Sequence, residues 1–563
     1  HLAQKVDLCP QLHPTLAGDD IAEIYNPATE STHFVRLVTF IEGIPLGRLK
    51  RQSAALLYDL GHKLGRLAAT LTDFDHPAAH RTFHWDLAHG LEVYQEHQHL
   101  IPADETKDYV NNLIASFRQQ TAPYLPYLSQ SVIHNDANDY NVIVGGGRDL
   151  YSRNQTVVGL IDLGDIVYTH TINDLAIAIA YAILDKRDPL ASAAEMVRGY
   201  HAARPLTSAE FSALWGLICL RLCTSVALAA YQQQQRPDDD YLAISQAPIE
   251  RTLPKIAAVH SRYATAVFRH ACGLEPLEYG RAITDYLRYT TPAPIMGPDA
   301  DLSQAVVLDL SVSSPLVSGD PAENSAAPFT RRIFDHMATA NATVAIGRYN
   351  EPRLIYTELS GSGDDFFDER RTIHLGLDLF AEADTAVYAP LAGEVYTFAN
   401  NAQEQDYGPV IILKHETDMG MPFFTLYGHL SPESLEGLTI GQKIKAGENF
   451  ATFGSAAVNG GWPPHLHFQI IVDLLEQDTD FVGVGFASQR AVWQAFSPDP
   501  NLLVGVPQEL FPPQKPSFGE TLTTRKKVTG QNLSLGYKNH LKIERGWMQY
   551  LYDHTGRRYL DPY

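Results

Sequence analysis

The sequence predicts a multidomain protein in which an α+β first part is followed by an all-β part and a short third piece. The chain has 563 residues, which at about 150 residues per domain suggests three or four domains. Helical apolar periodicity with a few short strands fills residues 1–291, whereas short β-type runs separated by Gly and Pro fill residues 345–500. Two stretches rich in proline and small residues, 292–344 and 501–518, predict linkers, so that residues 519–563 stand apart.

The composition excludes several classes of protein. Hydrophobic residues make up 45% and charged residues 19% of the chain, which is typical of a globular protein. Lys and Arg number 43 against 65 Asp and Glu, a net charge of −22. We therefore expect neither nucleic acid nor an anionic membrane as a partner, since both need a cationic face. Four cysteines without C-x-x-C spacing indicate a reducing compartment, which we take to be the cytoplasm.

The termini and the apolar runs bear on targeting. No run approaches the ~20 consecutive apolar residues of a membrane span. The chain begins at His1 without a signal-like segment and ends at Tyr563 inside a patterned segment. We therefore expect a fragment of a longer polypeptide.

The elements of the first part follow from local patterns. HFVRLVTFIEG (33–43) is an apolar run that ends at Gly, which predicts a buried strand entering a connector. Leucines at helical spacing predict a helix within residues 51–74. Val142–Val144 and Val157–Ile161 predict two strands on either side of a Gly-rich turn. Further helical segments are predicted over residues 173–185, 206–234 and 246–291.

The segment SVIHNDANDYNVIV carries the residue types that phosphoryl transfer requires. It contains His134-x-Asp136-x-x-x-x-Asn141, and Asp162 ends an apolar run further along the chain. Transfer to a hydroxyl needs a carboxylate beside the attacking oxygen, together with carboxylate and amide oxygens that hold Mg²⁺. The spacing predicts Asp136 as the base, Asn141 and Asp162 as magnesium ligands, and His134 as a residue that holds the loop. Each element alone is usually a polar loop or a turn, but their order and spacing together favour the functional interpretation.

This pattern resembles the aminoglycoside phosphotransferase and choline kinase group of small-molecule kinases. Residues 40–46 (FIEGIPL) are similar to the strand and connector between the two kinase lobes. Residues 173–176 (NDLA) are similar to the group's D-L-A helix start, in which the Asp, here Asp174, is structural. The resemblance implies a protein-kinase-like C-lobe within residues 1–291 that uses ATP and Mg²⁺.

The sequence departs from this group upstream of the connector. The group places its nucleotide-covering strands and an ATP-binding Lys there, and this chain starts too late to contain them, so we expect a truncated N-lobe and poor ATP binding. The GGG run at 145–147 lacks a following G-K-[ST] and is predicted to be a turn. In the predicted helix 206–234, Trp215, Arg221 and Tyr231 could line an acceptor pocket or pack, and packing is favoured for Trp215 and Tyr231.

The β-rich part gathers histidines and one aspartate at strand ends. His374-x-x-x-Asp378 lies in RRTIHLGLDLF, His429 in LYGHL, and His465-x-His467 in PPHLHFQ. Residues i and i+2 of a strand share a face, so His465 and His467 point the same way. Two imidazoles and one carboxylate form a tetrahedral zinc site with an open position, and zinc lowers the pKa of a bound water to about 7. A single histidine is usually a packed or surface residue, but the whole set predicts a zinc site.

This set resembles the lysostaphin and LytM-type zinc endopeptidases, whose motifs are H-x-x-x-D, Y-x-H-L and H-x-H. The resemblance implies that His374, Asp378 and His467 are the zinc ligands. It also implies that His429 and His465 position the water and stabilise the oxyanion. The usual T-G-x-x-x-x-x-H-L-H loop reads AAVNGGWPPHLH here, with a Trp and two prolines that would reshape the groove. A metal-binding or architectural module without peptidase activity stays open.

The third piece, residues 519–563, contains IERGWMQYLYDHTGRRYLD, with apolar strand residues around the tight turn 553–556. This pattern predicts a hairpin. The stretch also resembles the opening of class III pyridoxal-phosphate aminotransferases. That resemblance implies the start of an α/β domain, a pyridoxal-phosphate lysine beyond Tyr563, and a homodimer formed through the missing domain.

The order of the three parts resembles a bacterial fusion architecture, of which hydroxylysine kinase and related phospholyases resemble the separate-chain version. We therefore expect a multifunctional enzyme that uses ATP to phosphorylate a hydroxyl of a small amino alcohol or hydroxy amino acid, coupled to a pyridoxal-dependent elimination. Two alternatives stay open: a zinc metalloendopeptidase acting on peptides or peptidoglycan cross-links, and a degenerate metal-binding scaffold for the aminotransferase. Neither constellation has lost a catalytic residue that lies inside the chain, which speaks against the scaffold.

Overall fold

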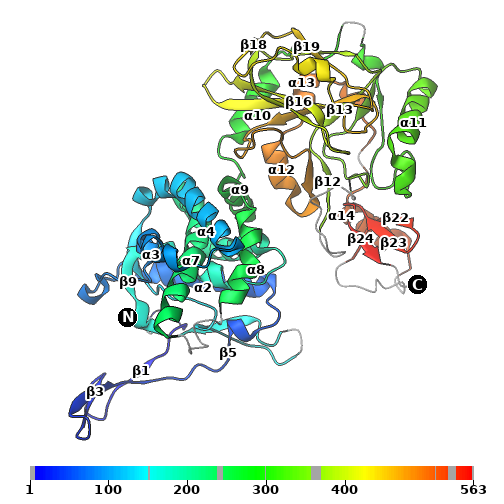
Figure 1. Cartoon of the computed structure of the whole chain (residues 1–563). Coiled ribbons are helices and arrows are strands. Elements are labelled where there is room, and N and C mark those ends of the chain that lie inside the picture. The colour runs from blue at the N-terminus through cyan, green and yellow to red at the C-terminus, as the bar shows by residue number, and fades with distance from the viewer. Residues whose placement is uncertain are drawn as a thin grey trace. The chain divides into compact units, whose positions relative to one another are not determined.

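The chain forms two compact units, His1–Pro276 and Leu277–Tyr563 (Figure 1). The computed structural model describes residues 5, 7–149, 152–236, 245–297, 300–356, 369–513, 515–530 and 540–560. The boundary precedes the expected domain end at residue 291, because helix α10 (Gly280–Tyr289) packs in the second unit. The rings of Tyr286 and Phe423 lie 6.1 Å apart there.

The first unit is a helical body with short strands at one side. Its helices are α2 (Ala54–Leu71), α3 (Gly90–His97), α4 (Glu105–Ser116), α5 (Asn173–Ala182), α6 (Pro189–Ala203), α7 (Ser208–Gln235), α8 (Gln246–Ala257) and α9 (Ser261–Ala271). Its strands are β1 (Leu12–His13), β2 (Ala22–Asn26), β3 (Ser31–Val35), β4 (Leu37–Val38), β5 (Ile44–Pro45), β6 (Gln130–Ile133), β7 (Val142–Gly145), β8 (Thr156–Leu160) and β9 (Val167–His170). Strands β5, β7 and β8 form one sheet, and β6 pairs with β9.

Glycines allow helices α2 and α6 to pack backbone against backbone. A Cβ at Gly61 would collide with the carbonyl oxygen of Met196, and one at Gly199 would collide with that of Tyr58. The leucines that predicted α2 from their spacing are buried along the same helix. Sequence periodicity therefore identified the helix, and the glycines determine how closely it packs.

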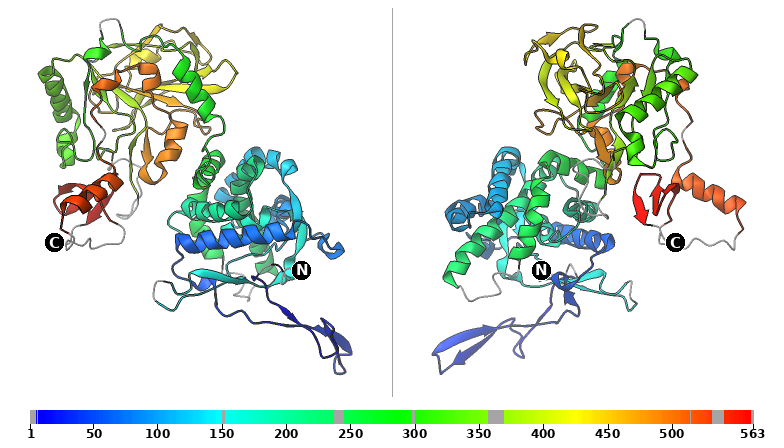
Figure 2. Two further views of the ribbon diagram at one scale, coloured as in Figure 1. Left: turned by 180° about the vertical axis from the view of Figure 1, so that it is seen from behind. Right: turned by 45° about the vertical axis from the view of Figure 1, so that its right-hand side comes forward.

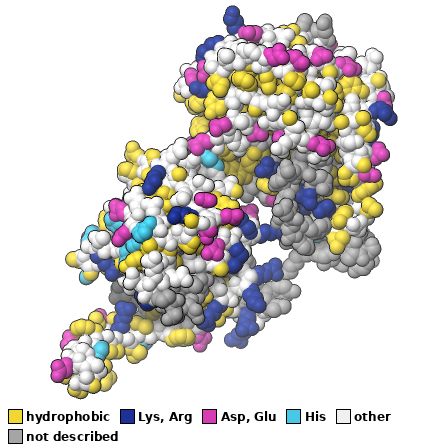
Figure 3. Space-filling model, in the orientation of Figure 1, with side chains coloured by type: hydrophobic (Ala, Val, Ile, Leu, Met, Phe, Trp, Pro, Cys, Tyr) yellow, Lys and Arg dark blue, Asp and Glu magenta, His cyan; other side chains and the backbone are white. Residues whose placement is uncertain are grey.

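The strand expected over residues 33–43 is not buried. β2 and β3 pair as a hairpin that extends away from the helices of this unit (Figures 1 and 2). Phe34 is 71% exposed and Phe40 is 88% exposed, and hydrophobic side chains show on the surface of this hairpin in Figure 3. A two-stranded ribbon has no interior of its own, so an apolar run is buried only where a second layer covers it. The connector does enter the sheet, since Ile44 of β5 pairs with Val144 of β7.

Helix α7 is the core helix of the first unit. It is long and apolar enough to cross a membrane by length and composition alone, but 94% of its most apolar window is buried inside the unit. Trp215 is 1% exposed and packs near Phe268, with ring centroids 6.1 Å apart. Tyr231 stacks on His97 at 4.4 Å. Both side chains pack against neighbouring aromatic rings.

The second unit is built on an eight-stranded sheet with the order β10-β11-β13-β20-β17-β16-β15-β18. Its strands are β10 (Val306–Val307), β11 (Ala345–Gly347), β12 (Arg371–His374), β13 (Leu377–Phe380), β14 (Ala386–Tyr388), β15 (Gly393–Asn401), β16 (Gly408–Glu416), β17 (Pro422–Gly428), β18 (Lys443–Ile444), β19 (Asn449–Thr452), β20 (His465–Ile471), β21 (Val484–Phe486), β22 (Ile543–Trp547), β23 (Tyr550–Asp553) and β24 (Arg558–Leu560). Its helices after α10 are α11 (Ala326–Thr339), α12 (Arg490–Phe496), α13 (Asn501–Val504) and α14 (Phe518–Val528). Because α12 lies inside residues 345–500, that region is β-rich rather than all-β.

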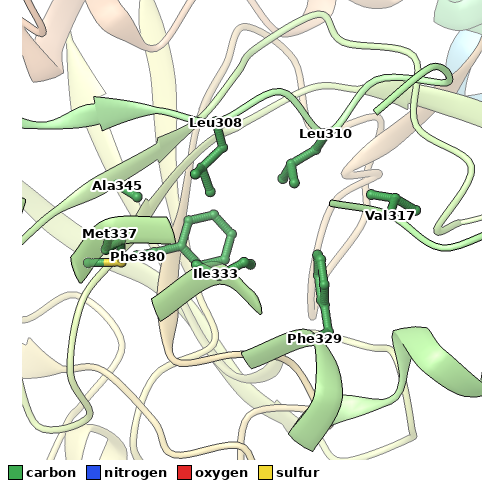
Figure 4. Packing of buried hydrophobic residues seen from close by; sticks show 8 residues of the cluster. All are labelled: Leu308, Leu310, Val317, Phe329, Ile333, Met337, Ala345 and Phe380. Carbon is green, nitrogen blue, oxygen red and sulfur yellow. The ribbon is translucent and has the colours of Figure 1, made fainter. Parts of the chain in front are cut away.

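The stretch 292–344, expected to be a linker, is instead part of this unit. β10 pairs in parallel with β11 at the sheet edge, and α11 packs beside them. The apolar cluster drawn in Figure 4 consists of Leu308, Leu310, Val317, Phe329, Ile333, Met337, Ala345 and Phe380. The Pro- and Ser-rich composition of this stretch concealed a small number of large apolar residues, and these are enough to anchor it on the sheet.

The second expected linker, 501–518, also contains structure, since Leu503 of α13 is 1% exposed. Beyond it, β22, β23 and β24 form a three-stranded sheet in which β23 and β24 are the predicted hairpin. Gly556 in the hairpin turn has φ +86°, a conformation that glycine adopts without strain. Thr372 donates a hydrogen bond from Oγ1 to the carbonyl of Thr555 at 2.6 Å, which ties the hairpin to β12.

Candidate functional site

One buried carboxylate holds the loop between β6 and β7 in the first unit. Asp174, 1% exposed at the start of α5, accepts hydrogen bonds from the backbone N–H groups of His134 at 3.1 Å and Asn135 at 2.7 Å. Asn135 has φ +68°, a left-handed conformation that is uncommon for a residue other than glycine. Burial raises the pKa of Asp174, and its two backbone bonds oppose that rise. Nε2 of His134 lies 3.1 Å from the carbonyl oxygen of Ile161, which joins the loop to the next strand.

Asp136 lies at the centre of this loop and is fixed by amide groups. Nδ2 of Asn141 donates to Asp136 Oδ2 at 2.7 Å and to its backbone oxygen at 2.9 Å. Nδ2 of Asn138 is 3.0 Å from both carboxylate oxygens. Burial raises the pKa of Asp136, while the charge of Arg221 and the bond from Asn138 lower it. The carboxylate is part-buried, and the hydrogen bonds from Asn138 and Asn141 hold it in one orientation.

Arg221 of α7 lies close to the carboxylate of Asp136. Its side chain is 3% exposed, and its Nη2 lies 3.6 Å from Asp136 Oδ1. The guanidinium lies over the rings of Trp85 at 4.6 Å and Tyr181 at 5.5 Å, and its Nη1 donates to the carbonyl of Trp85 at 3.1 Å. The sequence left open whether Arg221 lines a pocket or packs, because no local motif joins α7 to the loop.

The pairing of β7 with β8 brings Asn141 and Asp162 to the same sheet edge. The N–H of Ile161 donates to the backbone oxygen of Asn141 at 3.0 Å. Asn141 turns its amide nitrogen toward Asp136, so its Oδ1 is the atom that can take a cation. Asp162 is exposed, has φ +61° and accepts a hydrogen bond from Gly164 at 3.2 Å. An amide oxygen and an exposed carboxylate fit Mg²⁺, which prefers oxygen ligands and retains several waters.

In the second unit, three strands bring together His374, Asp378 and His467. The antiparallel register of β13 and β20 places Asp378 opposite His467, and His374 ends β12, which precedes β13 in the chain and pairs with β21. His374 Nε2 lies 3.1 Å from His467 Nδ1 and 3.1 Å from Asp378 Oδ1. Asp378 Oδ1 lies 3.2 Å from His467 Nδ1. Three buried ligand atoms therefore form a nearly equilateral triangle.

The second nitrogen of each imidazole and the second oxygen of the carboxylate each have a hydrogen-bond partner in the protein. His374 donates from Nδ1 to the carbonyl of Arg348 at 3.0 Å, and His467 Nε2 lies 3.0 Å from the acceptor Oε1 of Gln469. Asp378 Oδ2 accepts from Arg353 Nη1 at 2.7 Å. Because Nδ1 of His374 donates to a carbonyl and Nε2 of His467 faces an amide oxygen, the other nitrogen of each ring is turned toward Asp378 Oδ1.

This donor set fits a zinc ion. Ligands at about 2.0 Å in a tetrahedron are about 3.3 Å from one another, close to the triangle formed here. Burial lowers the pKa of His374 to about 4, so the ring is neutral at pH 7 and can donate its lone pair. Burial opposes ionisation of Asp378, but His374 and Arg353 outweigh it and hold the pKa of this carboxyl well below its ordinary value. Zinc binds ionised carboxylates and neutral imidazoles, so the protonation states of Asp378 and His374 suit it.

His429 and His465 lie beside the triangle without being part of it. Their ring centroids are 4.3 Å apart, and His465 Nε2 lies 3.8 Å from Asp378 Oδ1. His465 donates from Nδ1 to the carbonyl of Pro463 at 2.7 Å, and His429 donates from Nδ1 to that of Asn459 at 2.9 Å. Burial lowers the pKa of His465 to about 4 and that of His429 well below its ordinary value. Both rings therefore present an unprotonated Nε2 that can accept a proton.

The four histidines and Asp378 all line a cavity of about 400 Å³. Aromatic residues form much of its wall: Tyr356, Tyr407, Trp462 and Phe481. Trp462 lies edge to face with Tyr356 at 5.9 Å and donates from Nε1 to the carbonyl of Asp406 at 3.2 Å. The altered loop before His465 thus contributes a fixed aromatic wall to the groove.

Motif reasoning missed the residues behind the metal ligands. Gln469 shares a strand face with His467, so the period of two in HLHFQ could have identified it. Arg353 and Arg348 lie far upstream of His374 in a segment without a recognised motif. Their only signal is the charged segment RYNEPR directly after the apolar strand VAIG.

Comparison with known families gives two regional matches. Residues 2–210 match the family described as "Phosphotransferase enzyme family", and residues 372–479 match "Peptidase family M23". The hydroxylysine kinase of Bos taurus is 27% identical over 237 residues, which are 40% of this chain and 62% of the bovine protein. That of Danio rerio is 28% identical over 240 residues, 41% of this chain and 66% of the fish protein. The chain thus spans less than two thirds of the length of these curated relatives.

The chain thus contains a kinase-like α+β region similar to phosphotransferases, followed by a β-rich region similar to M23 peptidases. Among solved structures, a microcompartment-associated aminopropanol kinase is 18% identical, with a TM-score of 0.34, over 49% of this chain and 80% of that chain. The catalytic domain of lysostaphin from Staphylococcus simulans is 24% identical, with a TM-score of 0.16, over 21% of this chain and 80% of that chain.

The buried neutral histidines predict acid sensitivity of the metal-free second unit. The pKa of His374 and of His465 is about 4 in the fold, against an ordinary value of 6.5. The unfolded chain therefore binds more protons between these values, and the free energy of unfolding decreases as pH falls from 6.5 toward 4. Calorimetry of chelator-treated protein in steps across this range should show a falling Tm for the second unit, with a shallower slope in His465→Gln. A Tm that stays constant across the range would show that these two rings are not held neutral by the fold.

Proposed function

We propose that the first unit transfers the terminal phosphoryl group of ATP to a hydroxyl of a small amino alcohol or hydroxy amino acid. The observation that carries this proposal is the Asp136 carboxylate, which Asn138 and Asn141 orient through hydrogen bonds. The similarity to hydroxylysine kinases supports a small acceptor that carries both an amine and a hydroxyl.

In this mechanism the acceptor hydroxyl donates a hydrogen bond to Asp136, which takes its proton as the oxygen attacks phosphorus. Asn141 Oδ1 and Asp162 would hold Mg²⁺, which when bound neutralises charge on the phosphate oxygens. Arg221 contacts Asp136 Oδ1 from the protein side, while Asn141 and Asn138 restrain the carboxylate through its oxygens. The hydroxyl therefore meets a base whose orientation is already set.

We further propose that residues 519–563 open a class III aminotransferase domain that acts in the cytoplasm as a homodimer. A phosphorylated hydroxyl is a better leaving group than a free one, so elimination of phosphate in a pyridoxal-phosphate-dependent reaction is a chemically consistent next step. The four cysteines are free, which is consistent with a reducing compartment. None of the described residues of this segment is proposed to hold pyridoxal phosphate.

A second proposed activity belongs to the M23 region, where three ligand atoms converge. We propose that His374, Asp378 and His467 hold zinc and that the site hydrolyses a peptide amide. A bound zinc would polarise the amide carbonyl and acidify a water molecule. His465 and His429 each present a neutral Nε2 to the cavity, so one can accept the proton of the attacking water and deliver it to the leaving amine. The aromatic wall positions the peptide and excludes bulk water.

The kinase proposal predicts a specific loss on removing the base. Asp136→Ala should reduce acceptor-dependent ATP turnover by about 10²–10⁴-fold, because general base catalysis contributes on that order. The measurement is phosphoryl transfer from labelled ATP to a panel of amino alcohols and hydroxy amino acids by the full chain. Asp188→Asn, which retains the N-cap of α6, is the matched control and should keep full turnover. Equal turnover by Asp136→Ala and wild type would contradict the proposed role.

The hydrolase proposal predicts that zinc binding and cleavage can be separated. His465→Gln should retain one equivalent of zinc but cleave quenched glycine-rich peptides about 10²-fold more slowly or worse. His467→Ala should lose both zinc and cleavage. Zinc content is measured by elemental analysis alongside the cleavage rate. Zinc retention by wild type without cleavage of any peptide would instead support the scaffold alternative.

A further inference from the structure

We infer that Arg353 is the positioning residue of the metal site, which fixes two of the three ligands and limits Asp378 to one ligand oxygen. This inference rests on the proposed zinc hydrolase activity and deepens it. Arg353 is 2% exposed and lies before β12, outside the segment that matches the peptidase family.

The first contact is direct. Arg353 Nη1 donates to Asp378 Oδ2 at 2.7 Å, a charge-assisted bond between two side chains that are almost completely buried. The other oxygen, Oδ1, is the one that lies 3.1 Å from His374 Nε2 and 3.2 Å from His467 Nδ1. Oδ2 of Asp378 is therefore engaged by the guanidinium, and Oδ1 is the oxygen left to bind a metal ion.

The second contact reaches His374 through the backbone. Arg353 Nη2 donates to the carbonyl oxygen of Arg348 at 3.2 Å. The same oxygen accepts the Nδ1–H of His374 at 3.0 Å, which sets the tautomer and orientation of that ring. A displacement of Arg353 would thus free the carbonyl oxygen of Arg348, which orients His374. It would also free Oδ2 of Asp378.

The position of Arg353 is itself determined by buried partners. Its Nε donates to Glu351 Oε2 at 2.9 Å, and its Nη1 also donates to the hydroxyl of Tyr356 at 2.8 Å. Glu351 is 4% exposed, and its other oxygen accepts from Arg348 and from the N–H of Leu310. One guanidinium thus connects four acceptors at fixed angles, which a lysine ammonium cannot reproduce.

The third ligand provides an internal contrast. His467 is oriented by Gln469, whose Nε2 donates to Ser497 Oγ at 2.7 Å and to the carbonyl of Val482 at 3.1 Å. None of these groups contacts Arg353. Loss of Arg353 should therefore loosen His374 and Asp378, while Gln469 keeps His467 in its orientation. A freed Asp378 could then bind the metal through both oxygens and occupy the coordination position that the substrate needs.

The test compares Arg353→Lys with Arg332→Lys in the full chain. Arg332 of α11 donates to the carbonyl of Leu316 and to Asn324, and it contacts none of the three ligands, so it controls for a generic Arg-to-Lys change. We expect Arg353→Lys to bind zinc ten- to a hundredfold more weakly in competition with a chromogenic chelator, whereas Arg332→Lys equals wild type. The cobalt-substituted protein should show weaker visible absorption in Arg353→Lys, as its coordination number rises.

The outcomes separate the inference from the activity on which it rests. Arg353→Lys with wild-type zinc affinity and an unchanged cobalt spectrum would overturn the positioning role. Wild type that binds no zinc would overturn the metal proposal itself. If circular dichroism shows that Arg353→Lys does not fold, the double variant Arg353→Gln/Glu351→Gln removes both buried charges together. Retained zinc affinity in that folded double variant would equally overturn the role.

Discussion

The antiparallel pairing of β13 with β20 is the constraint on which the grouping of Asp378 with His467 depends. In this register Asp378 is opposite His467 and Phe380 is opposite His465 on one face, whereas Leu379 is opposite Leu466 on the other, apolar face. A shift of one residue would turn Asp378 toward the opposite face of the sheet. Leu379 and Leu466, both fully buried between these positions, stabilise the register that the polar residues need. Hydrophobic packing thus sets the positions of the ligands.

Burial of the ligands in turn requires charge compensation. Removal of Asp378 from water is costly unless a partner is buried with it, and Arg353 supplies that partner with Glu351 as its own counter-charge. The same principle applies in the first unit, where the buried Asp174 accepts hydrogen bonds from backbone N–H groups and the part-buried Asp136 lies 3.6 Å from Arg221. In both units a carboxylate is oriented by fixed donors, which keep its oxygens in defined directions.

Local sequence patterns predicted most of the residues of the two candidate sites. The residues that they missed reach these sites through contacts between distant parts of the chain. The spacing of His134, Asp136 and Asn141, and that of His374 and Asp378, identified residues that the fold brings together, because neighbouring strand ends are implied by short motifs. Arg353 could not be predicted in the same way, since it reaches Asp378 across a segment of irregular sequence. The composition led to a wrong prediction for residues 292–344. This stretch was predicted to be a linker because its few large apolar residues lie among many Pro and Ser residues. Conversely, Phe34 and Phe40 read as buried although the hairpin is exposed.

Our central proposal is that His374, Asp378 and His467 bind a single zinc ion and leave a position open. X-ray absorption spectroscopy of the zinc-loaded full chain tests it most directly. We predict only nitrogen and oxygen neighbours at about 2.0–2.1 Å, with multiple scattering from two imidazoles. Scattering from three or four imidazoles would contradict the proposal, because His429 or His465 would then be a ligand rather than a proton acceptor.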